Sequence, residues 1–507
     1  MSNGIRRYGE GTLSADNAGS NTDPENNIDP ESNTGPRNSP GTSRRQLLQN
    51  GLRGALVAGA MAGTGAWRAA PGPARRPARA HLRQPGSRPY PGRAAGADTI
   101  PQIKHIVVLM MENHSYDNKL GMLGRAGADG FTLGANGKPT ASNPYANGNI
   151  QHAFRMPTTC QLSGSPSQTW HDSHTSFDNG KNDGFVKSSS GPVSMGYWQR
   201  ADQPFYYSVA RQFPIADRYF CSLLGQTFPN RRFLISATSM GMVNDGVPDP
   251  LQYPKNGTIF DALNKHSISW KDYSSGGKFL NTTELYPLLA LRNLGKIVSI
   301  DHFYSDAKAG TLPSFSLVEP NYLSSSEEDP QSIAEGEAFA ARVINAVISG
   351  PAWKNTLLIW AYDEHGGYYD HVPPPTAIAP DNTPPDTPGG DHYNGFRQYG
   401  FRVPCAVISP WSRPDYVSHE IFDHTSICSL VEHKWNLPAM THRDANASPM
   451  LDMLDLSSPA FQTPPKLARP LVDTDPNALT CQKTGAGTIP PPGSVTKPKR
   501  AAAAVAG

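Results

Sequence analysis

This 507-residue sequence lacks Cys-x-x-Cys pairs, hydrophobic runs long enough to span a membrane, and an excess of charge of one sign. Its five cysteines include no Cys-x-x-Cys pair, which argues against a zinc cage, and their odd number argues against a disulfide scaffold. Export to an oxidising compartment would allow one or two disulfides, but the default expectation is that the cysteines are buried thiols. The cysteines are Cys160, Cys221, Cys405, Cys428 and Cys481.

The first 97 residues hold few large apolar side chains and many Asn, Ser, Gly, Pro, Ala and Arg, which predicts a disordered leader. Within it, Arg44 and Arg45 precede a weakly apolar run over 51–67. This pattern is typical of a Tat-type export signal, and the run is too short and too weakly apolar to span a membrane. We therefore expect a secreted or envelope-associated protein, with a disordered cytoplasmic tail as the alternative.

The overall charge balance, 45 basic against 43 acidic residues, hides a difference between the leader and the rest. The leader holds 13 Arg, no Lys and 6 acidic residues, so the remainder carries 32 basic and 37 acidic side chains, a formal charge of −5. A nucleic-acid-binding domain would need a basic face, so we expect no nucleic-acid partner. The composition predicts one domain over 98–475, followed by a disordered tail over 476–507.

Strand-length apolar runs alternate with helix-like segments in the predicted domain. The runs are continuously apolar rather than alternating, which indicates strands covered on both faces, as in a parallel sheet. They span 103–111, 267–273, 314–320, 356–362 and 401–410, and helical spacing occurs over 333–350 and 424–437. The fold class is therefore α/β with a mostly parallel sheet flanked by helices. Two long loops, 138–200 and 373–399, are better suited to building a site than to linking elements.

Two of these runs end in acidic residues. The first leads into Glu112 and Asn113, and the fourth leads into Asp363 and Glu364. In an open α/β sheet, ligands bind beyond the carboxyl ends of the strands, where these side chains would converge. Carboxylates brought so close repel one another unless a cation neutralises them. We expect one divalent metal ion; oxygen ligands favour Mg, Ca or Mn, and a neighbouring His would admit Zn or Fe. The alternative is that the acids are helix caps or solvated loop residues.

A third polar group lies at a predicted helix start over 222–238. Thr227 precedes Asn230 and Arg231 there, and Pro229 suits the first turn. Backbone donors at a helix start attract anions, and a fork-shaped guanidinium matches phosphate. Taken alone, the segment is better read as a Thr helix cap followed by a surface Arg.

Four motifs of the sequence resemble those of a bacterial phosphoesterase family and occur in the same order: ENHSYD, TFPNR, DEHGGYYDHV and FRVPCAVISP. That family holds phospholipase C enzymes and a secreted acid phosphatase, and plant non-specific phospholipase C belongs to it too. The resemblance covers about 101–440. It implies an α/β/α sandwich related to alkaline phosphatase and a metal-assisted hydroxyl nucleophile that forms a phospho-enzyme intermediate. By motif, Glu112, Asn113, Asp363 and Glu364 match the metal ligands, and Thr227 matches the nucleophile.

Further roles follow from residue type. Asn230 and Arg231 are expected to hold phosphoryl oxygens as charge develops. His365, His371 and His171 are candidates for handling protons, and His171 and Asp370 for contacting substrate.

Structural alternatives stay open for several of these positions. His171 lies in a stretch for which a structural role is equally expected. Asp370 and His371 can instead form a brace, and His424 can be a helix cap. Asp329 stands where the family often carries a His, and an acid there would repel a phosphate dianion.

These features predict an exported, metal-dependent phosphoric-ester hydrolase of phospholipase C type that acts on phospholipid or other phosphate esters. The alternatives are an acid phosphomonoesterase of the same fold and, less favoured, a non-catalytic surface binding protein. A carboxylesterase of the α/β-hydrolase type would need a Gly-x-Ser-x-Gly elbow, and the sequence has none. Aromatic side chains could line an apolar mouth or touch a membrane, although core packing is their commoner use; they are Trp198, Tyr206, Tyr207, Tyr368 and Tyr369.

Overall fold

The computed structural model describes residues 82–161, 166–276, 281–387 and 390–484, all within one compact unit. The twin-arginine pair, Arg44 and Arg45, lies outside the described residues. In the described part of the chain, no helix has the length and apolar character needed to cross a bilayer.

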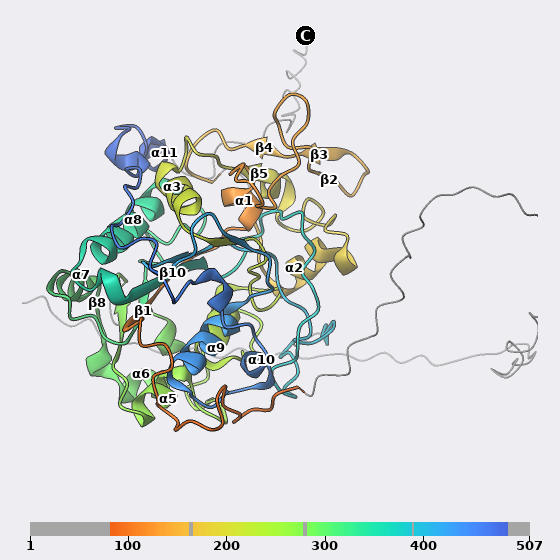
Figure 1. The fold of residues 1–507 in the computed structure, drawn as a ribbon. Helices are drawn as coiled ribbons and strands as arrows, with labels where there is room; N and C mark the ends of the chain where they lie inside the picture. The colour runs from red at the N-terminus through yellow and green to blue at the C-terminus, as the bar shows by residue number, and fades with distance from the viewer. Residues whose placement is uncertain (1–81, 162–165, 277–280, 388–389, 485–507) are drawn as a thin grey trace, which may run out of the picture. The chain divides into compact units, whose positions relative to one another are not determined.

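The centre of the fold is an eight-stranded sheet in the order β12-β6-β11-β10-β1-β9-β7-β8 (Figure 1). Its strands are β1 (His105–Met111), β6 (Ile215–Ala216), β7 (Trp270–Ser274), β8 (Ile297–Ser299), β9 (Phe315–Glu319), β10 (Thr356–Tyr362), β11 (Cys405–Ile408) and β12 (Val417–Ser418). Five of its neighbouring pairs are parallel, and only the two pairs that involve β11 are antiparallel. The predicted mostly parallel sheet is confirmed.

The two central strands show why continuous apolar runs mark this position. Every residue of β10, and all of β1 after His105, is buried, because helices cover both faces of the sheet. The strands run parallel with Met111 paired to Tyr362, so both end at the same edge. Two small sheets lie outside: β2 (Ser142–Pro144) with β3 (Ile150–His152), and β4 (Phe154–Arg155) with β5 (Gly196–Tyr197).

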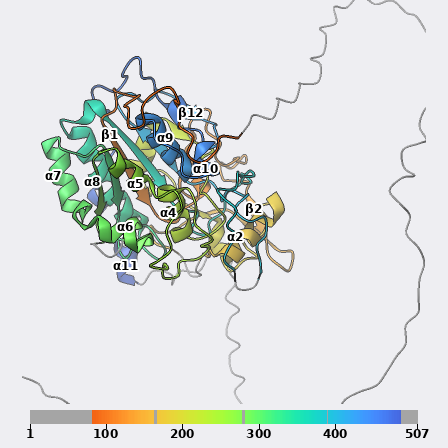
Figure 2. The same ribbon diagram turned by 90° about the horizontal axis from the view of Figure 1, so that it is seen from below.

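Helices form a layer on each side of the sheet, which gives the predicted three-layer sandwich (Figures 1 and 2). One layer contains α3 (Pro204–Gln212), α7 (Ile300–Ala309) and α8 (Ile333–Ser349), and the other contains α4 (Thr227–Ser236), α5 (Ile259–Lys265), α6 (Pro287–Arg292) and α9 (His424–Trp435). The remaining helices are α1 (Tyr116–Leu120), α2 (Trp170–Phe177), α10 (His442–Ala445) and α11 (Thr480–Thr484). Short 3-10 turns are η1 (Asp178–Gly180), η2 (Gly191–Met195), η3 (Thr282–Leu285), η4 (Leu294–Lys296), η5 (Trp353–Asn355), η6 (Leu451–Met453) and η7 (Leu471–Asp473).

The aromatic residues considered for an apolar mouth mostly belong to the core. Trp198, Tyr206, Tyr207 and Tyr368 are fully buried, and only Tyr369 is partly accessible. These rings pack among apolar neighbours, the commoner use of aromatic side chains, so four of the five cannot line an open mouth.

The folded part extends beyond both predicted domain boundaries. At the N-terminal side, residues 82–97 bond to the segment after α9: Gly86 N–H donates to Ala439 O at 2.7 Å, and the Asn436 amide donates to the carbonyl of Tyr90 at 2.9 Å. The composition predicts a leader through residue 97 because the leader makes these contacts with backbone groups. Such contacts require no apolar side chains and so leave no pattern in the sequence.

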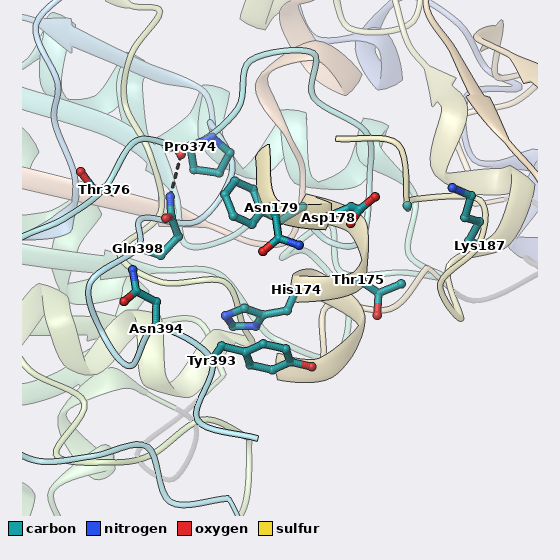
Figure 3. A pocket seen from close by; sticks show the side chains of 12 residues that line it. His174, Thr175, Asp178, Asn179, Lys187, Pro374, Thr376, Tyr393, Asn394 and Gln398 are labelled. Atoms are coloured by element: carbon teal, nitrogen blue, oxygen red, sulfur yellow. Dashed lines mark hydrogen bonds between the residues drawn. The ribbon is translucent and has the colours of Figure 1, made fainter. Parts of the chain in front are cut away.

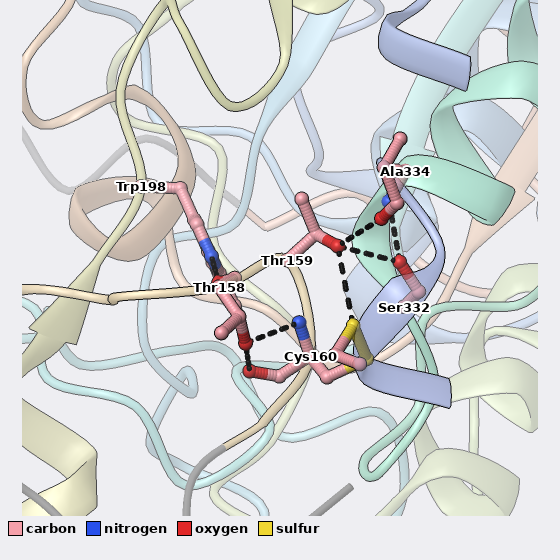
Figure 4. The surroundings of a disulfide bond; sticks show 8 residues. Thr158, Thr159, Cys160, Trp198, Ser332 and Ala334 are labelled. Carbon is pink, nitrogen blue, oxygen red and sulfur yellow. Dashed lines mark hydrogen bonds between the residues drawn. A yellow bond between two sulfur atoms is a disulfide. The ribbon is translucent and has the colours of Figure 1, made fainter. Parts of the chain in front are cut away.

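At the C-terminal side, a disulfide between Cys160 and Cys481 ties α11 to the domain (Figure 4). Thr159, the neighbour of Cys160, donates from its hydroxyl to Ala478 O at 2.8 Å. The bond corrects the expectation that all five cysteines are thiols and that the tail begins at 476. The remaining cysteines, Cys221, Cys405 and Cys428, are buried thiols as expected.

Candidate active site

The ends of β1 and β10 place the predicted ligand residues side by side. Because Met111 pairs with Tyr362, the residues that follow each strand leave the sheet together. Glu112, Asn113, Asp363 and Glu364 are all buried there, and Asn113 N–H donates to Asp363 Oδ1 at 3.3 Å. Asn113 and Asp363 are thus in contact, whereas, among the described residues, the ligand atoms of Glu112, Asp363 and Glu364 do not all lie within 4.8 Å of one another.

Local backbone geometry makes this convergence possible. Asn113 has a positive φ of 67°, which Asn tolerates better than most residues because its side chain is short and polar. Gly366 also has a positive φ, and a Cβ there would lie 1.8 Å from Asn113 O. Only glycine fits, so the Gly-Gly pair of the DEHGG motif lets the chain pass directly against the end of β1.

Helix α4 brings the predicted nucleophile to the same cluster. Thr227 is the first residue of α4 and is buried, and its Oγ1 lies 3.1 Å from the side-chain oxygen of Asn113. With its amide turned the other way, Asn113 would donate to Glu364 Oε1 at 2.6 Å and to Asp363 Oδ1 at 3.1 Å. With the amide oxygen facing inward, the side-chain oxygens of Asn113, Asp363 and Glu364 face one another with no side-chain donor of these three residues between them, an arrangement that a bound cation relieves.

The donor set fits a hard divalent cation. Burial, and then the charge of Asp363, raise the pKa of Glu112 and of Glu364 well above the usual range, although Arg231 opposes this at Glu112. Within the described part of the chain, Glu112 Oε2 has no hydrogen-bond partner. A buried carboxylate oxygen without a partner is costly unless it ligates a metal. The residues that would hold the ion are Glu112, Asn113, Thr227, Asp363 and Glu364.

Arg231 is buried at the centre of an ion-pair network. Its Nε donates to Asp363 Oδ2 at 2.9 Å, its Nη1 donates to Glu319 Oε2 at 3.0 Å, and its Nη2 lies 3.5 Å from Glu112 Oε1. Glu319 ends β9, the other neighbour of β1. The N–H groups of the Arg231 guanidinium face carboxylates. Arg231 therefore orients the candidate ligand residues, and the structure favours this role over the predicted hydrogen bonds to phosphate.

Asn230 is also engaged by the protein itself. Its side-chain oxygen accepts from the N–H groups of Ser222 (2.8 Å) and Leu223 (3.1 Å), and its amide donates to Gly225 O at 3.0 Å. These bonds fix the loop that leads into α4. The predicted contact with phosphate is therefore replaced by a role in positioning Thr227.

Asp370 and His371 belong to a separate ion-pair network, as the structural alternative anticipated. His371 Nδ1 bonds Asp117 Oδ2 at 2.7 Å and its Nε2 bonds Asp129 Oδ1 at 3.1 Å. Burial opposes protonation, but the hydrogen bond and charge of Asp117 raise the pKa of His371 to about 9. Arg402 donates to Asp370 at 2.8 Å and to Asp117 at 3.1 Å.

This network is the one place in the described residues where three ligand-type side chains, Asp117, Asp370 and His371, bring ligand atoms within 4.8 Å of one another. Its two carboxylates are compensated by Arg402 and His371, whereas three buried carboxylates share Arg231, so this group has less need of a cation than the oxygen cluster. We assign it as a brace between α1 and the loop after β10. Both nitrogens of His371 are engaged, which leaves neither for proton transfer in the oxygen cluster.

The other two predicted histidines differ in setting. His365 is fully buried, and burial lowers its pKa to about 3, so the ring is neutral. Its Nδ1 lies 3.1 Å from Glu364 Oε2 without hydrogen-bond geometry. His171 is exposed on α2 and bonds the Tyr393 hydroxyl at 2.9 Å. Tyr393, together with His174 and Lys187, lines a cavity of about 910 Å³ (Figure 3).

Several residues of the site carried no clear sequence signal. His424 is not the helix cap expected of it: Asp423 caps α9, and the His424 ring bonds Asp363 O at 2.6 Å, which steadies that ligand. Asp245 accepts from Phe228 N–H at 2.7 Å at the start of α4. Burial raises the pKa of Asp245 to about 6 and that of Glu328 to about 7. Glu328 precedes Asp329, which the sequence singles out, whereas no neighbouring motif indicates that Asp245 belongs to the site.

Asp329 does not present the charge expected from the sequence. It accepts from the Tyr368 hydroxyl at 2.8 Å, and burial raises its pKa to about 8. A carboxyl with that pKa is mostly protonated at neutral pH, so its predicted repulsion of a phosphate dianion is largely absent.

A family model described as "Phosphoesterase family" matches residues 103–438, which include both strand ends and α4. The chain belongs to the phosphoesterase family. Membership identifies it as an ester-bond hydrolase that acts on phosphate esters, and the motif resemblance is confirmed.

Curated relatives include "Phospholipase C A" of Mycobacterium tuberculosis, 32% identical over 78% of this chain and 84% of the relative. "Non-specific phospholipase C1" of Arabidopsis thaliana is 32% identical over 68% of this chain and 69% of the relative. Among solved structures, a protein in the alkaline phosphatase superfamily from Vibrio parahaemolyticus covers 72% of both chains with 10% identity and a TM-score of 0.35. A likeness this distant carries no argument about function.

Proposed function

We propose that this phosphoesterase is an exported, metal-dependent enzyme of phospholipase C type, which cleaves phospholipid or other phosphate esters with Thr227 as nucleophile. The observation that carries the proposal is the position of the Thr227 hydroxyl, 3.1 Å from Asn113 in a buried cluster of oxygen ligands at the ends of β1 and β10. The relatives named phospholipase C support the substrate class.

The metal, when bound, would lower the pKa of the Thr227 hydroxyl and withdraw charge from a phosphoryl oxygen. Thr227 Oγ1 loses its proton and forms a bond to phosphorus as the bond to the alcohol oxygen breaks, and the alkoxide takes up one proton and leaves as the alcohol. Water then attacks the phospho-threonine and releases the phosphorylated headgroup with Thr227 restored. Asn230 fixes the loop before Thr227, and Arg231 and His424 hold Asp363 in place throughout.

Export is supported by two independent features. The twin-arginine pattern at Arg44 and Arg45 predicts it, and the disulfide between Cys160 and Cys481 suits an oxidising compartment. An acid phosphomonoesterase of the same fold is the second candidate, favoured by the raised pKa of Asp329, which weakens the repulsion of a dianionic phosphate.

A substrate panel separates these candidates. Purified protein is assayed on p-nitrophenyl phosphate, p-nitrophenylphosphorylcholine and phosphatidylcholine, with and without EDTA. We expect phosphatidylcholine to yield diacylglycerol and phosphorylcholine, and EDTA to abolish turnover. Release of fatty acid instead, or hydrolysis that survives extended metal removal, would sink the proposal, and activity confined to the monoester would favour the phosphatase.

A further inference from the structure

An apolar pocket of about 460 Å³ opens beside the start of α4. That volume falls within the range of about 300–1,000 Å³ typical of ligand pockets. The lining comes from α4, the loop after it, η3, α6 and η4, and Figure 2 shows α6 and α4 on the same side of the molecule. Its apolar side chains include Phe228, Pro248, Leu285, Pro287, Leu291 and Leu294, and Glu284 and Tyr322 contribute to the polar part.

Two residues of the pocket's lining connect it to the residues of the oxygen cluster. Phe228 lines it and follows Thr227 directly in the chain. Tyr322 also lines it, and its ring lies 4.8 Å from the guanidinium carbon of Arg231, while its hydroxyl donates to Glu319. The pocket's lining therefore adjoins the segment that carries the proposed nucleophile.

Large apolar side chains stand exposed at the pocket's edge. Leu291 and Leu294, both in the lining, are 66% and 53% exposed. Val247, next to Pro248, is 97% exposed, and Leu251 in the same loop is 81% exposed. Single exposed apolar residues are ordinary, but several around one pocket mark a surface that meets lipid or protein. The aromatic residues first considered for that purpose are mostly buried in the core.

We propose that this pocket, lined by Phe228, Leu291 and Leu294, holds the acyl chains of a phospholipid, and that Val247 and Leu251 enter the lipid surface. The inference rests on the proposed function. In a phospholipase C reaction the acyl chains belong to the leaving alcohol, so they lie away from the phosphorus atom that Thr227 attacks. An apolar pocket that begins at the residue after the nucleophile suits that part of the substrate.

The first test uses short-chain phosphatidylcholines below their micelle concentration, with acyl chains of increasing length, and p-nitrophenylphosphorylcholine as the acyl-free ester. Burying a methylene strengthens binding by up to about fourfold, so kcat/KM of the wild-type enzyme should rise with chain length. In the double variant Leu291→Asn/Leu294→Asn, we expect the ratio of kcat/KM for the longest chain to that for the acyl-free ester to fall at least about tenfold. Leu133→Asn, 50% exposed elsewhere, is the matched control and should leave the ratio unchanged. An unchanged ratio in the double variant would overturn the proposal.

The second test does not depend on turnover. Sedimentation with phosphatidylcholine vesicles is measured for Thr227→Ala protein and for the same protein carrying Val247→Asp and Leu251→Asp. We expect the bound fraction to fall severalfold in the latter, and equal binding would contradict the lipid-facing role of this loop. If the wild-type protein binds vesicles but hydrolyses none of the phosphate esters, the proposed function fails while the lipid surface stands.

Discussion

The hydroxyl oxygen of Thr227 lies 3.1 Å from the side-chain oxygen of Asn113, which joins the first residue of α4 to the end of β1. Two segments more than a hundred residues apart thus meet in a buried cluster, and β10 adds Asp363 and Glu364 from the neighbouring strand.

Removing a ligand carboxylate should weaken metal binding. Glu112→Gln deletes the charge of a side chain whose Oε2 has no hydrogen-bond partner among the described residues, so we expect Mn²⁺ affinity, measured by calorimetry, to fall at least about tenfold. Glu420→Gln changes an exposed acid and serves as the control. Equal affinity in the two variants would exclude Glu112 as a ligand.

Replacing Arg231 should destabilise the fold. Arg231→Met leaves Asp363, Glu319 and Glu112 buried without their shared cation, and breaking a buried pair costs about 3–5 kcal/mol. Urea unfolding with EDTA present measures this loss, and Arg200→Met, at an exposed position, should change stability by less than about 0.5 kcal/mol. A small loss in Arg231→Met would show that the network is dispensable for stability.

The brace around His371 should make stability depend on pH. Its pKa is raised in the folded state to about 9, above the unfolded value of about 6.5. The stabilisation is therefore fully present below about pH 6.5 and is lost as pH rises through 9, and it amounts to at most about 3 kcal/mol. Unfolding free energies of wild type and His371→Gln should converge over this window. A difference that does not vary with pH would contradict the assignment.

Breaking the disulfide should loosen the C-terminal segment. The Cys160–Cys481 bond spans 321 residues, and removing a native disulfide typically costs about 2–5 kcal/mol. We expect the double variant Cys160→Ser/Cys481→Ser to unfold at lower urea, and dithiothreitol to affect the wild type but not the variant. If dithiothreitol destabilises the wild type and the double variant equally, its effect does not come from the Cys160–Cys481 bond.

Much of the fold and half of the site could be predicted from the sequence. The run 356–362 coincides with β10, because a strand buried on both faces must be apolar throughout. The convergence of Glu112 with Asp363 follows from strand ends meeting at one edge of a parallel sheet. These predictions needed only local pattern and a general rule of α/β folds.

The rest depends on contacts between distant segments. Nothing near Asp245 marks it as the partner of the Phe228 N–H, and nothing near Arg402 marks it as the neutraliser of Asp117. Arg231 was expected to face phosphate because local sequence shows its donors but not the carboxylates that occupy them. Composition could not reveal the pairing of Cys160 either, since connectivity is a property of the folded chain.

Whether Thr227 is the nucleophile can be read from the mass of the enzyme itself. Protein quenched in acid during turnover of phosphatidylcholine is digested and its peptides are weighed. We expect one phosphorylcholine group on the peptide that contains Thr227, and neither adduct nor turnover in Thr227→Ala. Full activity in Thr227→Ala, or an adduct on another residue, would contradict the proposed mechanism.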